Sequence, residues 1–241
     1  MARFPLLLAL FAGFYAPSAL ALQFWPSEVE WASWSDYCRA RYVVSAAGRS
    51  SRFVQQVSPS ESALWEKRMG DAWYALHHHC AALIYTQRAQ HAKTKKERDY
   101  LLDVSIRNYL FTLERTPKEN GMYPEMLTRM AMSYDLLGDM PHAIETLDTA
   151  IQLHPTFMSA YATKAMIFRR RGEISKAREI LQAANDASKG ESAEVHYSLG
   201  LLYLEEGDVG AAQEHARIAY SRGYPLPGLR RKLAASGHAI D

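Results

Sequence analysis

The sequence predicts an all-α fold, in which helical hairpins stack into a solenoid between an N-terminal helical extension and a C-terminal capping helix. Three observations predict this fold. Small, aromatic and glycine residues recur at a fixed spacing through the C-terminal half of the chain. Within each unit the apolar residues fall on one face of a helix. A glycine then follows where that helix has to end in a short turn.

The repeat is clearest in three consecutive segments, which begin at Pro124, Met158 and Ala193. Each segment has one glycine at the expected end of its first helix, and these glycines are 34 and then 35 positions apart. They are Gly138, Gly172 and Gly207. A fixed period with residue types in matching places is the signature of stacked helical hairpins.

Each segment also has the residues that a packed hairpin requires. An aromatic residue follows a small residue by one helical turn, which puts both on the buried face. These pairs are Ala131 with Tyr134, Ala165 with Phe168, and Gly200 with Tyr203. A small residue then occurs where the second helix must approach the first closely, at Ala143, Ala177 and Ala212. Asp139 and Asp208 follow two of the glycines, and we expect both to cap the next helix.

This pattern resembles the tetratricopeptide repeat family, whose unit is a pair of antiparallel helices with small, aromatic and glycine residues in these places. The resemblance implies a right-handed α-solenoid of such hairpins. With both ends of the chain included, the expected organisation is a signal peptide over 1–21, a helical extension over 22–70, a divergent first repeat with an insertion over 71–120, repeats over 121–156, 157–190 and 191–225, and a capping helix with a tail over 226–241.

The first repeat and the C-terminal end depart from the regular unit. If Tyr85 takes the place of Tyr134, then Ser105, Tyr109 and Thr112 stand where later repeats have apolar residues. The extra residues between these positions predict either longer helices or a long turn. After the last repeat, a short helix should cover the apolar face that has no successor. Its apolar stripe consists of Leu226, Leu229 and Leu233.

The resemblance also implies a binding surface, because the first helices of tetratricopeptide hairpins line a concave groove that binds peptides or partner helices. Carried over one repeat at a time, the groove positions are Thr128, Met132, Asp135, Ala162, Met166, Arg169, Tyr197, Leu201 and Leu204. This set lacks the lysine and asparagine residues with which one family variant clamps a C-terminal carboxylate. We therefore expect a different ligand, an extended segment or an amphipathic helix.

The first residues predict export. Arg3 precedes an apolar run, and Ala19-Leu20-Ala21 supplies small residues before a cleavage site, which is the layout of a secretory signal peptide. We therefore expect a periplasmic protein with no stable membrane insertion after cleavage. Removing Arg3 leaves 27 of the 28 basic residues against 26 acidic ones, so the mature chain is close to neutral. This balance does not favour a nucleic-acid partner.

The stretch from His77 to Cys80 puts three histidines directly before one of the two cysteines. Consecutive helical residues point in different directions, so the three imidazoles cannot converge on one ion. In an exported chain, two cysteines most economically form one disulfide, here between Cys38 and Cys80. Free thiols and a metal- or redox-handling role that uses Cys80, His77, His79 and His91 remain the alternatives.

The N-terminal extension has its own helical signals. Ser27 and Glu30 form a potential capping box, and Trp31, Trp34 and Cys38 follow as one helical stripe. A second helix should start at Ser58-Pro59, with proline in its first turn. We expect these helices to pack on the first repeat and cover it. The alternative is that the tryptophans, with Trp25, form an exposed docking patch.

No catalytic motif is present: the sequence has no nucleophile elbow, no phosphate-binding glycine loop and no zinc-protease signature. We therefore predict no enzymatic activity and no cofactor. The predicted function is a periplasmic scaffold, assembly factor or chaperone that binds another envelope protein or a peptide segment in the groove. The sequence does not predict the oligomeric state.

Overall fold

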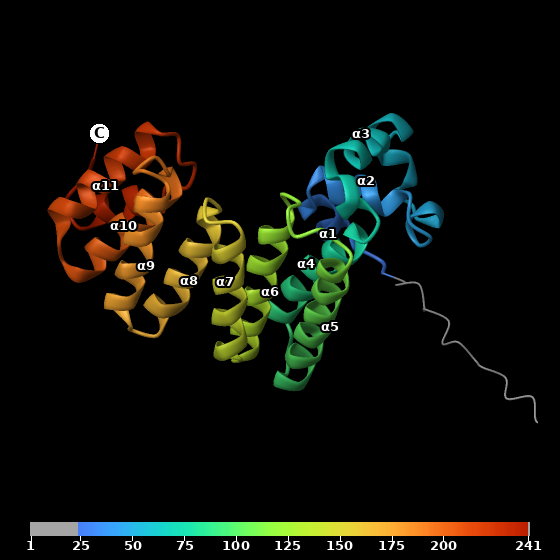
Figure 1. Ribbon diagram of the computed structural model, residues 1–241, viewed down its shortest axis with the longest axis horizontal. Coiled ribbons are helices and arrows are strands. Elements are labelled where there is room, and N and C mark those ends of the chain that lie inside the picture. Colours follow the sequence, from blue (N-terminus) through green and yellow to red (C-terminus); the bar gives the residue numbers. More distant parts are fainter. Residues whose placement is uncertain (1–23, 241) are drawn as a thin grey trace, which may run out of the picture.

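The computed structural model describes residues 24–240, and within that range every regular element is helical (Figure 1). The expected signal peptide, residues 1–21, lies outside the described residues. The α-helices are α1 (Glu28–Ser33), α2 (Asp36–Val43), α3 (Pro59–Met69), α4 (Leu76–Gln90), α5 (Lys95–Glu114), α6 (Tyr123–Leu137), α7 (Met140–Leu153), α8 (Met158–Arg170), α9 (Ile174–Ala187), α10 (Ala193–Glu206), α11 (Val209–Ser221) and α12 (Gly228–Ala235). No helix in this part of the chain combines the length and apolarity that a bilayer-spanning segment needs.

The helices α4 to α11 form four consecutive hairpins. In each hairpin a helix packs against its successor, and the first helices of neighbouring hairpins, α6 with α8 and α8 with α10, also contact one another. Figure 1 shows the hairpins following one another along the long axis of the molecule, from α4–α5 to α10–α11. The all-α solenoid expected from the repeat is confirmed.

Local sequence signals place the turns within the hairpins. Gly138, Gly172 and Gly207 have φ of 89°, 77° and 83°, a left-handed conformation that favours glycine. Asp139 accepts a hydrogen bond from the backbone N–H of His142 at 3.3 Å, so the expected cap is present. Asp208 caps α11 in the same way, through the backbone N–H of Ala211 at 3.0 Å. The three small residues of the second helices, Ala143, Ala177 and Ala212, are fully buried.

The first hairpin accommodates its extra residues mainly by lengthening its second helix. The helix α5 has 20 residues, whereas α7 has 14, and only four residues separate α4 from α5. The expected equivalents Ser105, Tyr109 and Thr112 are all buried. The buried hydroxyl of Ser105 donates a hydrogen bond to the carbonyl oxygen of Ala82 at 3.0 Å. Because this polar group has a partner, a serine is tolerated where later repeats have alanine.

The N-terminal extension covers the first hairpin, as expected. The capping box of Ser27 and Glu30 is present, and Ser58 caps α3 with Pro59 in the first turn. The expected single stripe through Trp31 and Cys38 is divided between two helices, because Trp34 adopts an extended backbone at the end of α1. Both halves nevertheless face inward, since Trp31 and Trp34 are buried.

Trp25, the third tryptophan of the alternative docking patch, behaves differently. Trp25 lies before α1, and 55% of its surface is exposed. Trp31 by contrast stacks on Phe53 with ring centroids 4.4 Å apart. The alternative of an exposed docking patch is therefore wrong for Trp31 and Trp34, because both rings are buried and the Trp34 indole N–H bonds to the Cys80 carbonyl of α4.

The C-terminal helix α12 covers the last hairpin. Leu229 and Leu233 are fully buried and pack in one cluster with Ala212 and Ala216 of α11. Leu226, which was expected on the same stripe, precedes the helix and is 54% exposed. The stripe is therefore shorter than expected, because the helix starts only at Gly228.

Candidate binding groove

Three adjoining hollows run along one side of the solenoid, and we call them together the trough. The N-terminal hollow is lined by the extension, α4 and α6, the central hollow mostly by α6 and α8, and the C-terminal hollow by α8, α9 and α10. Glu125 and Arg129 line both the first and the second hollow. Thr163 and Glu194 line both the second and the third. These shared residues make the trough continuous. All four belong to the first helices of their hairpins, α6, α8 and α10.

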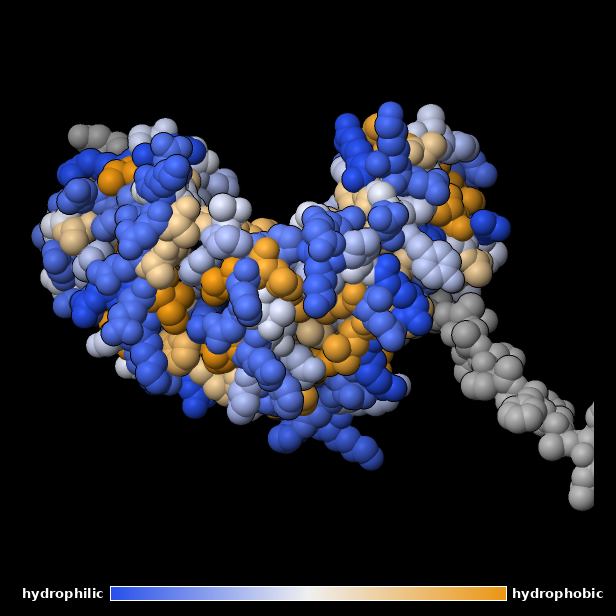
Figure 2. Space-filling view, in the orientation of Figure 1, coloured by the Kyte–Doolittle hydropathy of each residue, from blue (hydrophilic) through white to orange (hydrophobic). Residues whose placement is uncertain are grey.

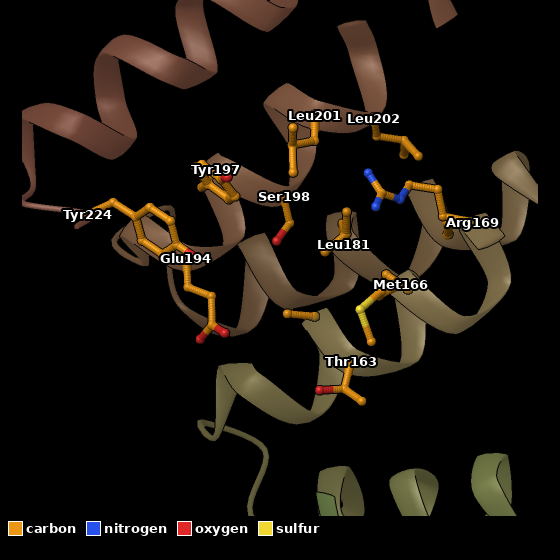
Figure 3. A pocket seen from close by; sticks show the side chains of 13 residues that line it. Thr163, Met166, Arg169, Leu181, Glu194, Tyr197, Ser198, Leu201, Leu202 and Tyr224 are labelled. Carbon is orange, nitrogen blue, oxygen red and sulfur yellow. The ribbon is translucent and has the colours of Figure 1, made fainter. Parts of the chain in front are cut away.

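The C-terminal hollow contains the largest group of the expected groove residues (Figure 3). Its volume is about 210 Å³, and Ala162, Met166 and Arg169 of α8 face Tyr197 and Leu201 of α10 across it. Its floor is formed by buried side chains of the hairpin core, Ala165, Ala177, Leu181 and Leu202. The hollow is therefore mostly apolar inside, with polar groups at its ends.

The central hollow contains two more of the expected residues, Thr128 and Met132. Thr128 is 5% exposed, and its hydroxyl donates to the carbonyl oxygen of Pro124 at 2.8 Å. Its polar group is thus already satisfied within α6. Met132 is half-buried and offers a flexible apolar side chain to a ligand.

The other two expected residues, Asp135 and Leu204, line none of the three hollows. Asp135 forms an ion pair with Arg170 of the next repeat. Leu204 packs against the cluster that α12 forms with the last hairpin. Both positions were carried over from a regular array, in which neither an inter-repeat ion pair nor a C-terminal helix occupies the groove.

Several residues of the trough were not expected from the repeat pattern, and Tyr224 is the clearest. It lies in the connection between α11 and α12, and its ring stacks on Tyr197 with centroids 4.2 Å apart. Burial, with a further contribution from the nearby Glu194, raises the pKa of Tyr224 to about 12. The repeat pattern carries no signal for this residue, because it lies at the end of the last expected repeat, outside the positions at which residue types recur.

Two charged side chains, Arg169 and Glu194, lie at the ends of the C-terminal hollow, and only the first has a partner of opposite charge among the described residues. Arg169 donates to Glu205 at 3.0 Å, so its charge is balanced within the protein. Glu194 accepts a hydrogen bond from the hydroxyl of Ser159 at 2.9 Å. Within residues 24–240 no cation forms an ion pair with this carboxylate. The trough therefore has a negative charge at the junction of its central and C-terminal hollows.

The histidine stretch has a structural explanation. Cys38 and Cys80 form a disulfide with Cα atoms 5.5 Å apart, which confirms the expected pairing. His79 is fully buried between the rings of Tyr37 and Tyr109, and burial lowers its pKa to about 3. His78 contacts the Asn108 side chain at 2.7 Å through its Nδ1.

The arrangement does not favour a metal site at these histidines. Cys80 is in the disulfide, and His91 is at the opposite end of α4 from His77. Among the described residues, no three His, Cys, Asp or Glu side chains converge in a way that could hold a metal ion. Within the described residues, the metal-binding form of this alternative therefore has no ligand set.

The hairpins define a helical-repeat solenoid, an architecture that implies protein–protein interaction. Residues 112–188 match the family model for the auxiliary subunit of N-terminal acetyltransferase A, a family of tetratricopeptide-like helical repeats. The match runs from the end of α5 to the connection after α9 and so covers two of the hairpins. A comparison with curated proteins finds no match.

Proposed function

We propose that this protein is a periplasmic interaction module, a scaffold, assembly factor or chaperone for a complex of the cell envelope, and that it binds a peptide segment or a helix of its partner in the trough. The observation that supports this most strongly is the continuity of the three hollows along the first helices of the hairpins. A binding role is consistent with this surface, which joins a largely apolar C-terminal hollow to a central hollow lined mostly by polar side chains.

The proposed compartment rests on two independent features. The first residues have the layout of a secretory signal peptide. The two cysteines form a buried disulfide, and such bonds persist in oxidising compartments such as the bacterial periplasm. A cytosolic protein of this size would more commonly keep both thiols reduced.

The experiment that tests this function is site-specific photocrosslinking in living cells. A crosslinking residue at Met166 would point into the C-terminal hollow, and one at Gln182, an exposed position of α9, would serve as the control. The expected result is a dominant adduct with one envelope protein from Met166. The adduct should be lost when Ala162→Glu puts a charge into the same hollow.

Two outcomes would contradict the proposal. Equal adducts from Met166 and Gln182, unaffected by Ala162→Glu, would mean that the trough is not a binding surface. Adducts from a crosslinker at the exposed Trp25, with none from Met166, would place the binding surface on the N-terminal extension instead. Mass spectrometry of the adducts identifies the partner in either case, and fractionation of the cells reports the compartment.

A further inference from the structure

The C-terminal hollow has the size of a pocket for a single side chain. Its volume is about 210 Å³, whereas an apolar cavity of roughly 150 Å³ already binds benzene. Met166 and Leu201 form opposite walls and Leu181 lies at the base (Figure 3). One aromatic or branched aliphatic side chain of a partner would fill this half-open hollow and would bury its inner face against the apolar floor.

The two charged residues beside this hollow differ in how readily they can pair with a charged group of a partner. Arg169 is held by Glu205, so a partner carboxylate would have to displace an existing ion pair. Glu194 is held only by the neutral Ser159 hydroxyl, and its carboxylate lies at the end of the hollow next to Tyr224 (Figure 3). The trough is therefore complementary to a positive rather than a negative group at this end.

From this arrangement we propose that the trough selects a segment in which a large apolar residue is accompanied by a lysine or arginine. The apolar side chain enters the C-terminal hollow, and the basic side chain binds the carboxylate of Glu194. This inference rests on the proposed function, because it names the chemistry of the segment that the trough binds.

The geometry of α10 sets the spacing of the two groups. Glu194 and Leu201 are seven residues apart on this helix, which corresponds to roughly 10 Å along its axis. An extended segment rises roughly 3.3 Å per residue. The basic residue should therefore lie within about three positions of the apolar one in an extended partner.

The shared position of Glu194 strengthens the assignment. This residue lines the central hollow as well as the C-terminal one, so a segment that follows the trough has to pass its carboxylate. Glu194 also stands in the first turn of α10, where a negative charge is favoured by the helix dipole. A stabilising role and a binding role make different predictions, because only the second changes which peptides are bound.

The test is a selection of random dodecapeptides displayed on phage, with the purified protein as bait and deep sequencing of the bound pool. Four baits are compared: the unchanged protein, Glu194→Gln, Met166→Glu and a control, Glu179→Gln, at an exposed position of α9. The unchanged protein and the control should enrich peptides with a large apolar residue and a basic residue within three positions. For one such peptide, synthesised and titrated, Glu194→Gln should weaken binding about tenfold, the effect of losing one charge-assisted contact.

The outcomes separate this inference from the proposed function. Enrichment of a basic residue by the unchanged protein and not by Glu194→Gln supports it. If Met166→Glu abolishes the enriched set, but the peptides show no basic preference that depends on Glu194, the segment chemistry is wrong and groove binding stands. If all four baits enrich the same peptides, or none enriches any, both the inference and the groove as a peptide site are overturned. Circular dichroism melting of each bait shows that the variants remain folded.

Discussion

The indole N–H of Trp34 donates to the carbonyl oxygen of Cys80 at 3.0 Å, beside the disulfide that joins Cys80 to Cys38. These two links fix the N-terminal extension to the first helix of the first hairpin. Trp34 and both cysteines are buried, so these links lie inside the core and cover the apolar end of the solenoid. The first hairpin, which has no preceding repeat, thus has a cover of its own.

Removing the disulfide should destabilise the protein. The bond closes a loop between positions 42 residues apart, for which the chain-entropy treatment gives about 3–4 kcal/mol. The double variant Cys38→Ala/Cys80→Ala should lose about that much free energy of unfolding, measured by urea denaturation. Reduction of the unchanged protein should have a similar effect. An unchanged midpoint in both experiments would mean that noncovalent contacts, such as that of Trp34 with Cys80, hold the extension in place.

The second helix of the third repeat offers a test of the repeat register. Ala177 is fully buried where α9 meets α8, so Ala177→Leu should overpack the hairpin and cost about 1–3 kcal/mol. Ala183→Leu, at an exposed position of the same helix, is the matched control and should leave the stability nearly unchanged. Thermal melting of the two variants makes the comparison, and equal melting temperatures would contradict the register.

The approach of α12 to α10 can be tested at a glycine. A Cβ atom on Gly200 would lie 2.5 Å from the Leu229 Cδ2 atom, so Gly200→Ala should loosen α12 even though alanine favours a helix. At Gly210 the nearest atom would be the Asp208 Oδ1 at 3.7 Å, and Gly210→Ala should be neutral or slightly stabilising. Limited proteolysis in the 222–227 connection reports the difference. Equal protection of the two variants would show that Leu229 moves aside at little cost.

Acid should destabilise the protein through its buried histidine. The pKa of His79 in the folded protein is about 3, well below the unfolded value of about 6.5. The unfolded chain therefore binds the proton first, and the free energy of unfolding falls as the pH drops below about 6.5. At pH 5 the loss from this residue should be about 2 kcal/mol.

The variant His79→Leu separates this contribution from other acid effects. It should reduce the dependence of the urea midpoint on pH between 7.5 and 5, because it removes one of two buried histidines with a low pKa; His77, whose pKa burial lowers to about 3, keeps part of the slope. Neither ring nitrogen of His79 has a hydrogen-bond partner among the described residues, so no bond is lost in the exchange. His91→Gln, at an exposed position, is the control and should keep the slope of the unchanged protein. An equal slope in both variants would place the acid sensitivity elsewhere.

The sequence by itself determined the hairpins of this protein. Gly138 and Asp139 end one helix and cap the next through contacts that span only a few residues, and the same holds for Gly207 and Asp208. Such signals act locally, so a recurring pattern is enough to locate them. The disulfide partners followed as well, because the chain has only two cysteines.

The tertiary structure alone decided which parts of the groove are available. Leu204 was expected to line the groove, but it is half-buried against the cluster that α12 forms with the last hairpin. Tyr224 was not expected there, but its connection brings it against Tyr197. Both outcomes depend on how a non-repeated segment packs on the repeated ones, through contacts between residues far apart in the chain. A periodic pattern describes the contacts within and between equal units, and it contains no information about a segment that occurs once.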